Sequence, residues 1–238
     1  MKNMFCDINS TSTFPKWDFI DAGLWYLLPD DERYVTGDIR LWAYKAAYLQ
    51  YNKNKIITHA NREKIPALLL AGIAISEAAG TPERFKAYGV LQFYQIRDYF
   101  NNSGNTISNK TSIGSLAIQL RAAAETLGID PSTLSTTQQL QLSNCLLDDD
   151  FNISIVAKHL KSLIILDNPG IEDTLNISDE QLIIAASRYN RGMERKKDDF
   201  ISSINAPKGD PSRIYSSYGR TILKRKDIIY KIIGINHE

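Results

Sequence analysis

One carboxylate, Glu77, stands at the end of an apolar stretch, where an ordinary surface residue is not expected. Its spacing of three and four residues from Ala74 and Ile73 puts it on the apolar face of a helix. Gly80-Thr81-Pro82 ends that helix just beyond, so Glu77 lies near the negative end of the helix dipole. Burial and the dipole both favour the protonated acid. A carboxylic acid that holds its proton suits general-acid cleavage of a glycosidic bond.

The alternative is a structural Glu77 that turns to solvent or pairs with an arginine. If the residue is catalytic, a second carboxylate could stabilise the positive charge on the sugar ring or activate a water molecule. Glu83 and Asp98 are the candidates, because both lie in the irregular stretch 79–111 that follows. Long irregular segments inside compact domains are often functional.

The segments that would position these residues are helical. No stretch alternates with period two over the length of a strand, whereas apolar residues recur with a helical period through most of the chain. Pro66 marks the start of the Glu77 helix, and Ser178 with Gln181 forms a capping-box pattern before a later one. The sequence predicts an all-α fold with a polar connector over 52–62 and with helices over 17–28, 38–51, 66–77, 113–127, 131–147, 150–164 and 179–191.

Three segments follow one another in a recognisable order: the helix that ends in Glu77, a Thr-Ser-Ile-Gly turn at 111–114, and Tyr-Asn-Arg-Gly at 189–192 closing a later helix. This order resembles the lysozyme-like superfamily that includes goose-type lysozymes and soluble lytic transglycosylases. A further helix is similar to the Asn-Ile-x-x-x-Ala-x-x-Leu-x-x-Leu helix of that family through Asn152, Ile153, Ala157, Leu160 and Leu163. The resemblance covers about residues 64 to 230.

The resemblance implies a role for each of these segments. Glu77 would be the catalytic acid, and the turn at Ser112 with the helix after it would line the sugar cleft. Tyr189 would donate a hydrogen bond near Glu77 or to the substrate, and Asn190 would hold the helix end or contact the sugar. In the transglycosylases one Glu suffices, because the acetamido and 6-hydroxyl groups of the substrate complete the reaction. Hydrolysis and transglycosylation both remain open.

The chain departs from the family at one glutamine. Family members commonly carry it three residues after the turn glycine, where this chain has Ala117, and the nearest glutamine is Gln119. An earlier run, Tyr-Gly-Val-Leu-Gln ending at Gln92, looks like the Gly-Leu-Met-Gln element of the transglycosylases. Ser112, Gln119 and Gln92 are therefore all candidates to bind sugar hydroxyl or acetamido groups. The alternative for each is a turn or helix-cap residue.

Charge and composition argue against several classes of function, among them general nucleic-acid binding and metal binding. The formal net charge is +1, which argues against a general nucleic-acid binder, although residues 188–231 hold twelve Lys or Arg against five acids. That stretch would suit an anionic polymer such as peptidoglycan. Cys6 and Cys145 are far apart in the chain, so no disulfide framework is expected. The three histidines follow no ligand spacing, and no metal or cofactor is implied.

The sequence therefore predicts an all-α, lysozyme-like catalytic domain over 61–238 with an N-terminal helical extension over 1–60. The expected activity is that of a muramidase, acting on the β-1,4 bond between N-acetylmuramic acid and N-acetylglucosamine in bacterial peptidoglycan. The rival hypothesis is a non-catalytic helical module that binds a glycan or a protein. A weaker third one is a nucleic-acid-binding protein that uses the basic C-terminal stretch.

The N-terminus carries no signal-peptide pattern, and no apolar stretch reaches the length of a membrane span. We therefore expect synthesis in the cytoplasm and action in the periplasm or on the cell wall after export or delivery. A phage endolysin or an antibacterial effector would fit this route. In the effector case the expected partners are the secretion machinery and a cognate immunity protein that fills the cleft.

Overall fold

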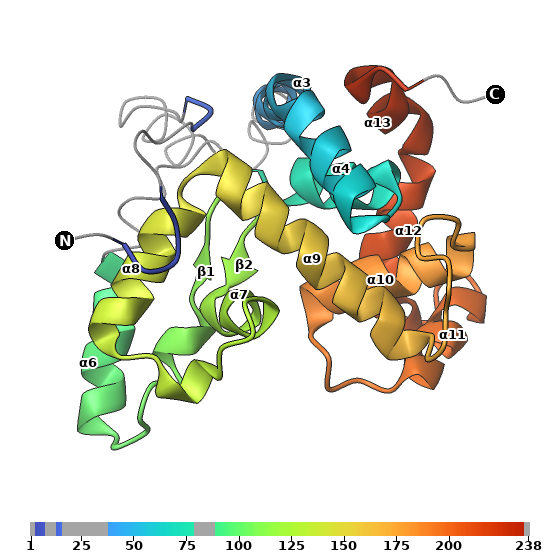
Figure 1. Ribbon diagram of the computed structural model, residues 1–238. Helices are drawn as coiled ribbons and strands as arrows, with labels where there is room; N and C mark the ends of the chain where they lie inside the picture. Colours follow the sequence, from blue (N-terminus) through green and yellow to red (C-terminus); the bar gives the residue numbers. More distant parts are fainter. Residues whose placement is uncertain (1–2, 8–12, 16–37, 79–88, 236–238) are drawn as a thin grey trace. The chain divides into compact units, whose positions relative to one another are not determined.

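The structure is a computed structural model that describes residues 3–7, 13–15, 38–78 and 89–235. Contacts between Cα atoms divide the chain into two units. Unit 1 comprises 1–52 and 77–156, and unit 2 comprises 53–76 and 157–238. Two long helices, α3 (Asp38–Glu63) and α9 (Asp149–Asp167), each contribute one part to each unit (Figure 1).

The described residues are mostly helical, as the sequence predicts: 68% are in helices and 2% in strands. The polar stretch 52–62, expected as a connector, belongs to the 26-residue helix α3. Residue 60, the expected limit of an N-terminal extension, is thus inside a helix and not in a linker. The helix expected over 17–28 falls outside the described residues. Within the described ranges, each helix is too short or too polar to cross a lipid bilayer.

In its described residues, unit 1 holds three short helices, a hairpin and two single 3-10 turns. β1 and β2 pair antiparallel, with Ser112 opposite Gln119 and Ile113 opposite Ile118. The hairpin runs directly into α7 (Figure 1). The described elements of this unit, besides its parts of α3 and α9, are α6 (Leu91–Phe100), η3 (Ser108–Lys110), β1 (Ser112–Ile113), β2 (Ile118–Gln119), α7 (Leu120–Thr126), η4 (Pro131–Thr133) and α8 (Thr136–Leu146).

The hairpin corrects the prediction of a helix over 113–127, because only the last part of that range is helical. Apolar residues at the helical positions of this range are buried in the hairpin instead, so both structures satisfy the same pattern. The turn between the strands needs positive φ at Gly114 (82°) and Ala117 (55°), which an α-helix does not allow. At Gly114 a Cβ atom would lie 2.3 Å from Nδ2 of Asn152 and 2.4 Å from the carbonyl oxygen of Leu146.

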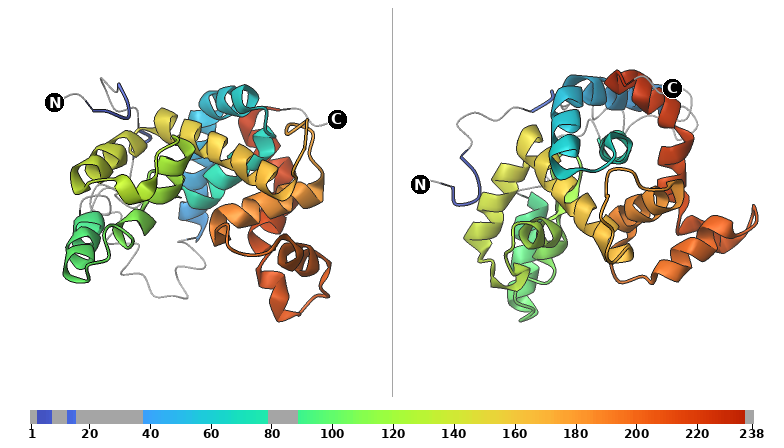
Figure 2. Two further views of the ribbon diagram at one scale, coloured as in Figure 1. Left: turned by 60° about the horizontal axis from the view of Figure 1, so that its bottom comes forward. Right: turned by 45° about the vertical axis from the view of Figure 1, so that its right-hand side comes forward.

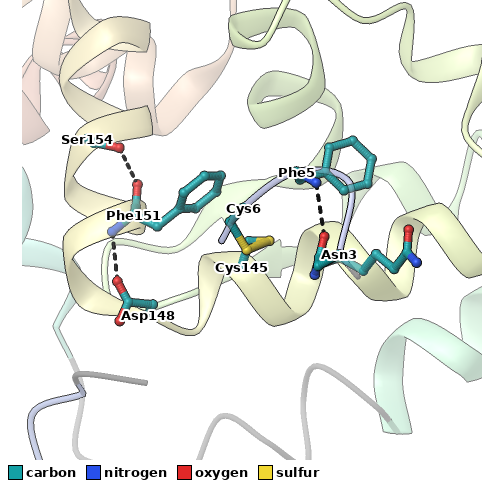
Figure 3. The surroundings of a disulfide bond; sticks show 8 residues. Asn3, Phe5, Cys6, Cys145, Asp148, Phe151 and Ser154 are labelled. Carbon is teal, nitrogen blue, oxygen red and sulfur yellow. Dashed lines mark hydrogen bonds between the residues drawn. A yellow bond between two sulfur atoms is a disulfide. The ribbon is translucent and has the colours of Figure 1, made fainter. Parts of the chain in front are cut away.

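A disulfide joins Cys6 to Cys145 in α8, with 5.9 Å between their Cα atoms (Figure 3). The expectation that these two cysteines form no disulfide was therefore wrong. Their separation of 139 residues gave no sign of pairing, because only the fold brings them together. Asn3 adds a second link by donating from its side chain to the carbonyl oxygen of Gln141 at 2.9 Å. The segment 3–7 is thus fastened along α8.

Unit 2 is built around α4 (Ala67–Glu77), whose residues 68–75 are all buried. A helix that is apolar on every side belongs in a core. In the right-hand view of Figure 2, α4 is seen nearly end-on, with α3 and the C-terminal helices around it. Its Gly72 touches Ile222 closely, because a Cβ atom there would lie 2.3 Å from a methyl carbon of that isoleucine.

The remaining helices of unit 2 pack on one another, with α10 in contact with α11 and α12 (Figure 2). The predicted capping box is confirmed, since Ser178 accepts from the backbone of Gln181 and the side chain of Gln181 accepts from Ser178. Gly219 of α12 approaches the backbone of Ile183 too closely for any Cβ atom. These elements are α10 (Asp179–Arg191), α11 (Lys197–Asn205), η5 (Pro211–Ile214), α12 (Ser217–Lys224) and α13 (Lys226–Ile233).

Candidate active site

Glu77 is the last residue of α4, as the sequence predicts, and its side chain is half-buried. The preceding residues of this helix form the core of unit 2, so the backbone that carries Glu77 is held firmly. No basic residue occupies the last turn of α4. Glu77 therefore lies at the negative end of the helix dipole without a cation in the same turn.

Ser112 and Gln119, two of the proposed sugar-binding residues, are brought together by the hairpin. Residues directly opposite each other in paired strands point to the same side of the sheet. Ser112 is exposed, and Gln119 is half-buried and accepts a hydrogen bond from Nε of Arg121 at 2.8 Å. This bond orients the amide of Gln119 so that its NH2 group remains as a donor for a ligand.

Gln92, the alternative to Gln119, is an exposed residue in the first turn of α6. The segment around it was expected to be irregular, but 91–100 is a regular helix. Gln92 and Gln119 thus come from different elements of unit 1.

Asp98, one candidate for a second carboxylate, is bound to the loop after its own helix. It is only 2% exposed, and its carboxylate accepts hydrogen bonds from Oγ of Ser103 at 2.7 Å and from the backbone N–H groups of Ile107 and Ser108 at 2.9 and 2.8 Å. Burial alone would raise the pKa of Asp98, but these hydrogen bonds outweigh it and lower the pKa below its usual value. The residue therefore holds the loop after α6 in place. Glu83, the other candidate, falls outside the described residues.

Tyr189 and Asn190 lie in the last turn of α10, in unit 2. Tyr189 is half-buried, and its ring centroid lies 6.0 Å from that of His159. Burial lowers the pKa of His159 to about 4, so its imidazole is neutral at pH 7. Asn190 is exposed. Gly192 ends the helix with a φ of 89°, and its N–H donates to the carbonyl oxygen of Arg188.

Asn152 has a role that the sequence did not reveal. Its Oδ1 accepts from the backbone N–H of Leu116 at 2.9 Å, and its Nδ2 donates to the carbonyl oxygen of Ile113 at 3.5 Å. The residue matched to the family through its helix thus holds both sides of the hairpin turn beside Ser112. A buried asparagine in an otherwise apolar helix face was the available signal.

Asp149 is a second missed residue, fully buried at the start of α9. Its carboxylate accepts from Oγ of Ser115 at 2.8 Å and from the backbone N–H of Phe14 at 2.7 Å. Tyr48 and Asn52 of α3 also donate to it, at 3.2 and 3.4 Å. One carboxylate therefore ties α3, the hairpin turn and the N-terminal segment to α9. These contacts position the hairpin that carries Ser112 and Gln119.

Comparison of the chain with protein-family models, with curated proteins and with solved structures found no match. Among the described residues, no group of three His, Cys, Asp or Glu side chains is arranged to hold a metal ion.

Proposed function

We propose that this protein cleaves bacterial peptidoglycan at the β-1,4 bond between N-acetylmuramic acid and N-acetylglucosamine, with Glu77 as general acid. The observation that carries the proposal is the position of Glu77, half-buried at the end of a helix whose other residues form a core. A carboxyl group at the C-terminal end of a helix suits a proton donor, because it lies at the negative end of the helix dipole. Half exposure leaves that proton within reach of a ligand.

In the proposed reaction the Glu77 carboxyl transfers its proton to the glycosidic oxygen while the bond from that oxygen to C1 of the sugar breaks. The N-acetylglucosamine leaves with its free 4-hydroxyl group, and positive charge develops on the muramic acid ring. Either water or the 6-hydroxyl of the same sugar then attacks C1 and returns a proton to Glu77. Because Asp98 is committed to its own loop, the scheme uses no second carboxylate from that position.

Substrate binding is assigned to polar side chains of unit 1, the unit to which Glu77 also belongs. Ser112 and the amide NH2 of Gln119 stand opposite each other on the hairpin and can bind neighbouring hydroxyl or acetamido groups. Gln92 of α6 completes the proposed set in unit 1, with an exposed side chain. The roles of Tyr189 and Asn190 stay predictions from the family resemblance.

The test is digestion of purified peptidoglycan by the wild-type protein, E77Q and the control E125Q, whose carboxylate is exposed on α7. We expect E77Q to lose at least about 100-fold in rate, because general-acid catalysis contributes factors of that order, and E125Q to keep the wild-type rate. Mass spectrometry of the products distinguishes 1,6-anhydro ends, made by a transglycosylase, from reducing ends, made by a hydrolase. Full lytic activity of E77Q would remove Glu77 from the mechanism.

We place this activity in the periplasm or at the cell wall, after export. The Cys6–Cys145 disulfide supports this location, because such bonds persist in oxidising compartments and are rare in the cytosol. In a producing cell that is itself sensitive to the enzyme, an immunity protein that covers Glu77 would be the partner.

A second candidate function, non-catalytic binding of a glycan or protein, is favoured by the outward face of α6. Leu91 and Asp98 turn inward, whereas Phe93, Ile96 and Phe100 are exposed at helical spacing, with Phe93 60% and Phe100 76% accessible. An exposed apolar face of this kind marks an interaction surface, and aromatic rings can pack on the faces of sugars. Saturable binding to peptidoglycan without soluble products would favour this candidate over the enzyme.

A further inference from the structure

Three arginines of unit 2 gather at the end of the 3-10 turn η5. Nη2 of Arg220 donates to the carbonyl oxygen of Arg213 at 2.6 Å, and Nη2 of Arg191 donates to the next carbonyl, that of Ile214, at 2.9 Å. Both side chains are therefore anchored to consecutive carbonyl groups at the end of η5. They arrive from α10 and α12, two helices that pack on each other.

Arg213 adds a third positive charge beside Arg220. Its own guanidinium donates from Nη1 to the carbonyl oxygen of Ala206, which fixes it across the loop before η5. Burial and the positive charge of Arg213 together lower the pKa of Arg220. The side chains of Arg213 and Arg220 are both half-buried, so water screens their repulsion incompletely.

This charge is not balanced by a carboxylate. Neither Arg191, Arg213 nor Arg220 forms an ion pair within the described part of the chain. Asp210 already accepts a hydrogen bond from the backbone N–H of Ser212 at 2.8 Å. Hydrogen bonds from the side chain and the backbone of Ser212 are the main causes of the lowered pKa of Asp210, and the charge of Arg213 contributes least. By contrast, the buried Arg188 of the same unit is paired with Asp167.

One donor in the group has no partner. Nε of Arg220 is buried without a hydrogen bond. A buried polar group left unsatisfied costs about 1–3 kcal/mol, more when it is charged. The carbonyl contacts use one N–H of Arg191 and one of Arg220, whereas each guanidinium has five. The hydrogen bonds to the carbonyl groups at the end of η5 therefore explain where the side chains of Arg191 and Arg220 lie, but they leave most of the N–H donors of both side chains unused.

We propose that Arg213 and Arg220, with Arg191 beside them, bind a small oxyanion, a carboxylate or a phosphate. An oxyanion offers acceptors to two N–H groups of one guanidinium at once, which is the geometry that arginine binds best. It would satisfy Nε of Arg220 and neutralise the two neighbouring charges. If the proposed function is correct, the carboxylates of the peptidoglycan peptide stem are one source of this group, and free phosphate is the other.

The first experiment measures thermal unfolding in sodium phosphate and in sodium chloride at equal ionic strength and pH. Phosphate stabilises many proteins by exclusion from their surface, so the variant R220Q sets the baseline. We expect the wild-type midpoint to rise by about 2–4 °C more than that of R220Q, as for about 1 kcal/mol of binding in a chain of this size. The control K208Q, which removes an exposed charge near η5, should behave as the wild type.

Two further variants keep the test decisive. R213Q should also lose the additional stabilisation by phosphate. R220K keeps the positive charge but lacks the Nε donor, so this variant should bind phosphate about tenfold more weakly than the wild type. R220K therefore provides the comparison if R220Q fails to fold. Equal phosphate effects in the wild type, R220K and R213Q would overturn the proposal, as would the absence of any excess over chloride in the wild type.

The second experiment separates the two sources by titration calorimetry with a soluble muropeptide and with an uncharged N-acetylglucosamine oligomer. If the wild type binds the muropeptide more tightly than R220K does, while the neutral oligomer binds both alike, the ligand is a wall carboxylate. If only inorganic phosphate distinguishes the two proteins, the ligand is a free phosphate. A lack of lytic activity with an intact phosphate effect would refute the proposed function and leave the anion site standing.

Discussion

Asp98 and Asn152 show how polar side chains on helices can serve the backbone of a neighbouring loop. Asp98 gathers N–H groups from the loop after its own helix. Asn152 satisfies a donor and an acceptor of the hairpin turn. Both side chains thus have a structural role. Asn152 supports the hairpin that carries Ser112 and Gln119, and Asp98 supports the loop after the helix that carries Gln92.

Replacing Gly114 by alanine should destabilise the protein strongly. The new Cβ would clash with Asn152 and with a backbone oxygen, at a residue whose φ of 82° already disfavours any side chain. We expect a loss of more than about 2 kcal/mol in unfolding free energy, measured by urea denaturation. Gly128→Ala is the matched control, because its φ of 76° is similar but open space surrounds it. Equal losses in the two variants would show that the contact with Asn152 is unimportant.

His159 should make the protein less stable in mild acid. Its pKa is about 4 in the folded state and near 6.5 when unfolded, so the unfolded chain takes up a proton first as the pH falls. The stabilising contribution is present above pH 6.5, shrinks between 6.5 and 4, and amounts to about 3 kcal/mol in total. Urea denaturation at several pH values should show a shallower loss over this interval for H159Q. Parallel curves for the two proteins would refute this assignment.

At the scale of elements, the sequence was a good guide wherever one periodic pattern and a cap agreed. The α10 helix begins at its predicted capping box and ends at Gly192. The hairpin was missed because Ile113, Leu116 and Leu120 satisfy a helical period and a buried hairpin equally well. Two residues with positive φ decide between them, and one is an alanine that carries no turn signal.

Helix α6 was missed because its sequence does not show the expected pattern of apolar residues inside and polar residues outside. Asp98 lies inside, while Phe93, Ile96 and Phe100 lie outside. A prediction based on one buried apolar face therefore does not identify this segment as a helix. The candidate site was likewise predictable only in part. The position of Glu77 at the end of a helix followed from the sequence, whereas the pairing of Ser112 with Gln119 depends on the hairpin that the sequence did not predict.

The reversed face of α6 predicts an unusual response to substitution. Phe93→Ser and Phe100→Ser should each change the unfolding free energy by no more than about 0.5 kcal/mol, because both side chains are already exposed. Leu91→Ala, on the buried side of the same helix, should cost about 2–5 kcal/mol. Urea denaturation of the three variants compares the two faces directly. A large loss at either phenylalanine would mean that the aromatic face is covered within the protein.

At the scale of the whole molecule, two contact units share two long helices, and the N-terminal segment is held to unit 1 by a covalent bond. Phe14, which follows that bond, lies against the rings of Tyr44, Tyr48 and Tyr51 of α3. The part of the chain nearest its start is therefore integrated into unit 1 by a disulfide, by aromatic contacts and by Asp149.

Reducing the disulfide should lower the stability of the protein by up to about 5 kcal/mol, the value expected for closing a loop of more than 100 residues. The measurement is urea denaturation with and without a dithiol reductant. The double variant C6S/C145S should match the reduced wild type and should not respond to the reductant. If the reductant lowers the stability of the double variant by the same amount, the effect lies elsewhere.

The disulfide can form only after a large part of the chain has been synthesised. The thiol of Cys6 leaves the ribosome 139 residues before that of Cys145, so the bond must wait until α8 has been synthesised. Disulfides persist in oxidising compartments and are rare in a reducing cytosol, so the covalent link between Cys6 and α8 depends on the redox state of the surroundings. Where the surroundings are reducing, residues 3–7 are held to α8 by non-covalent contacts alone, such as the hydrogen bond from Asn3 to the carbonyl oxygen of Gln141.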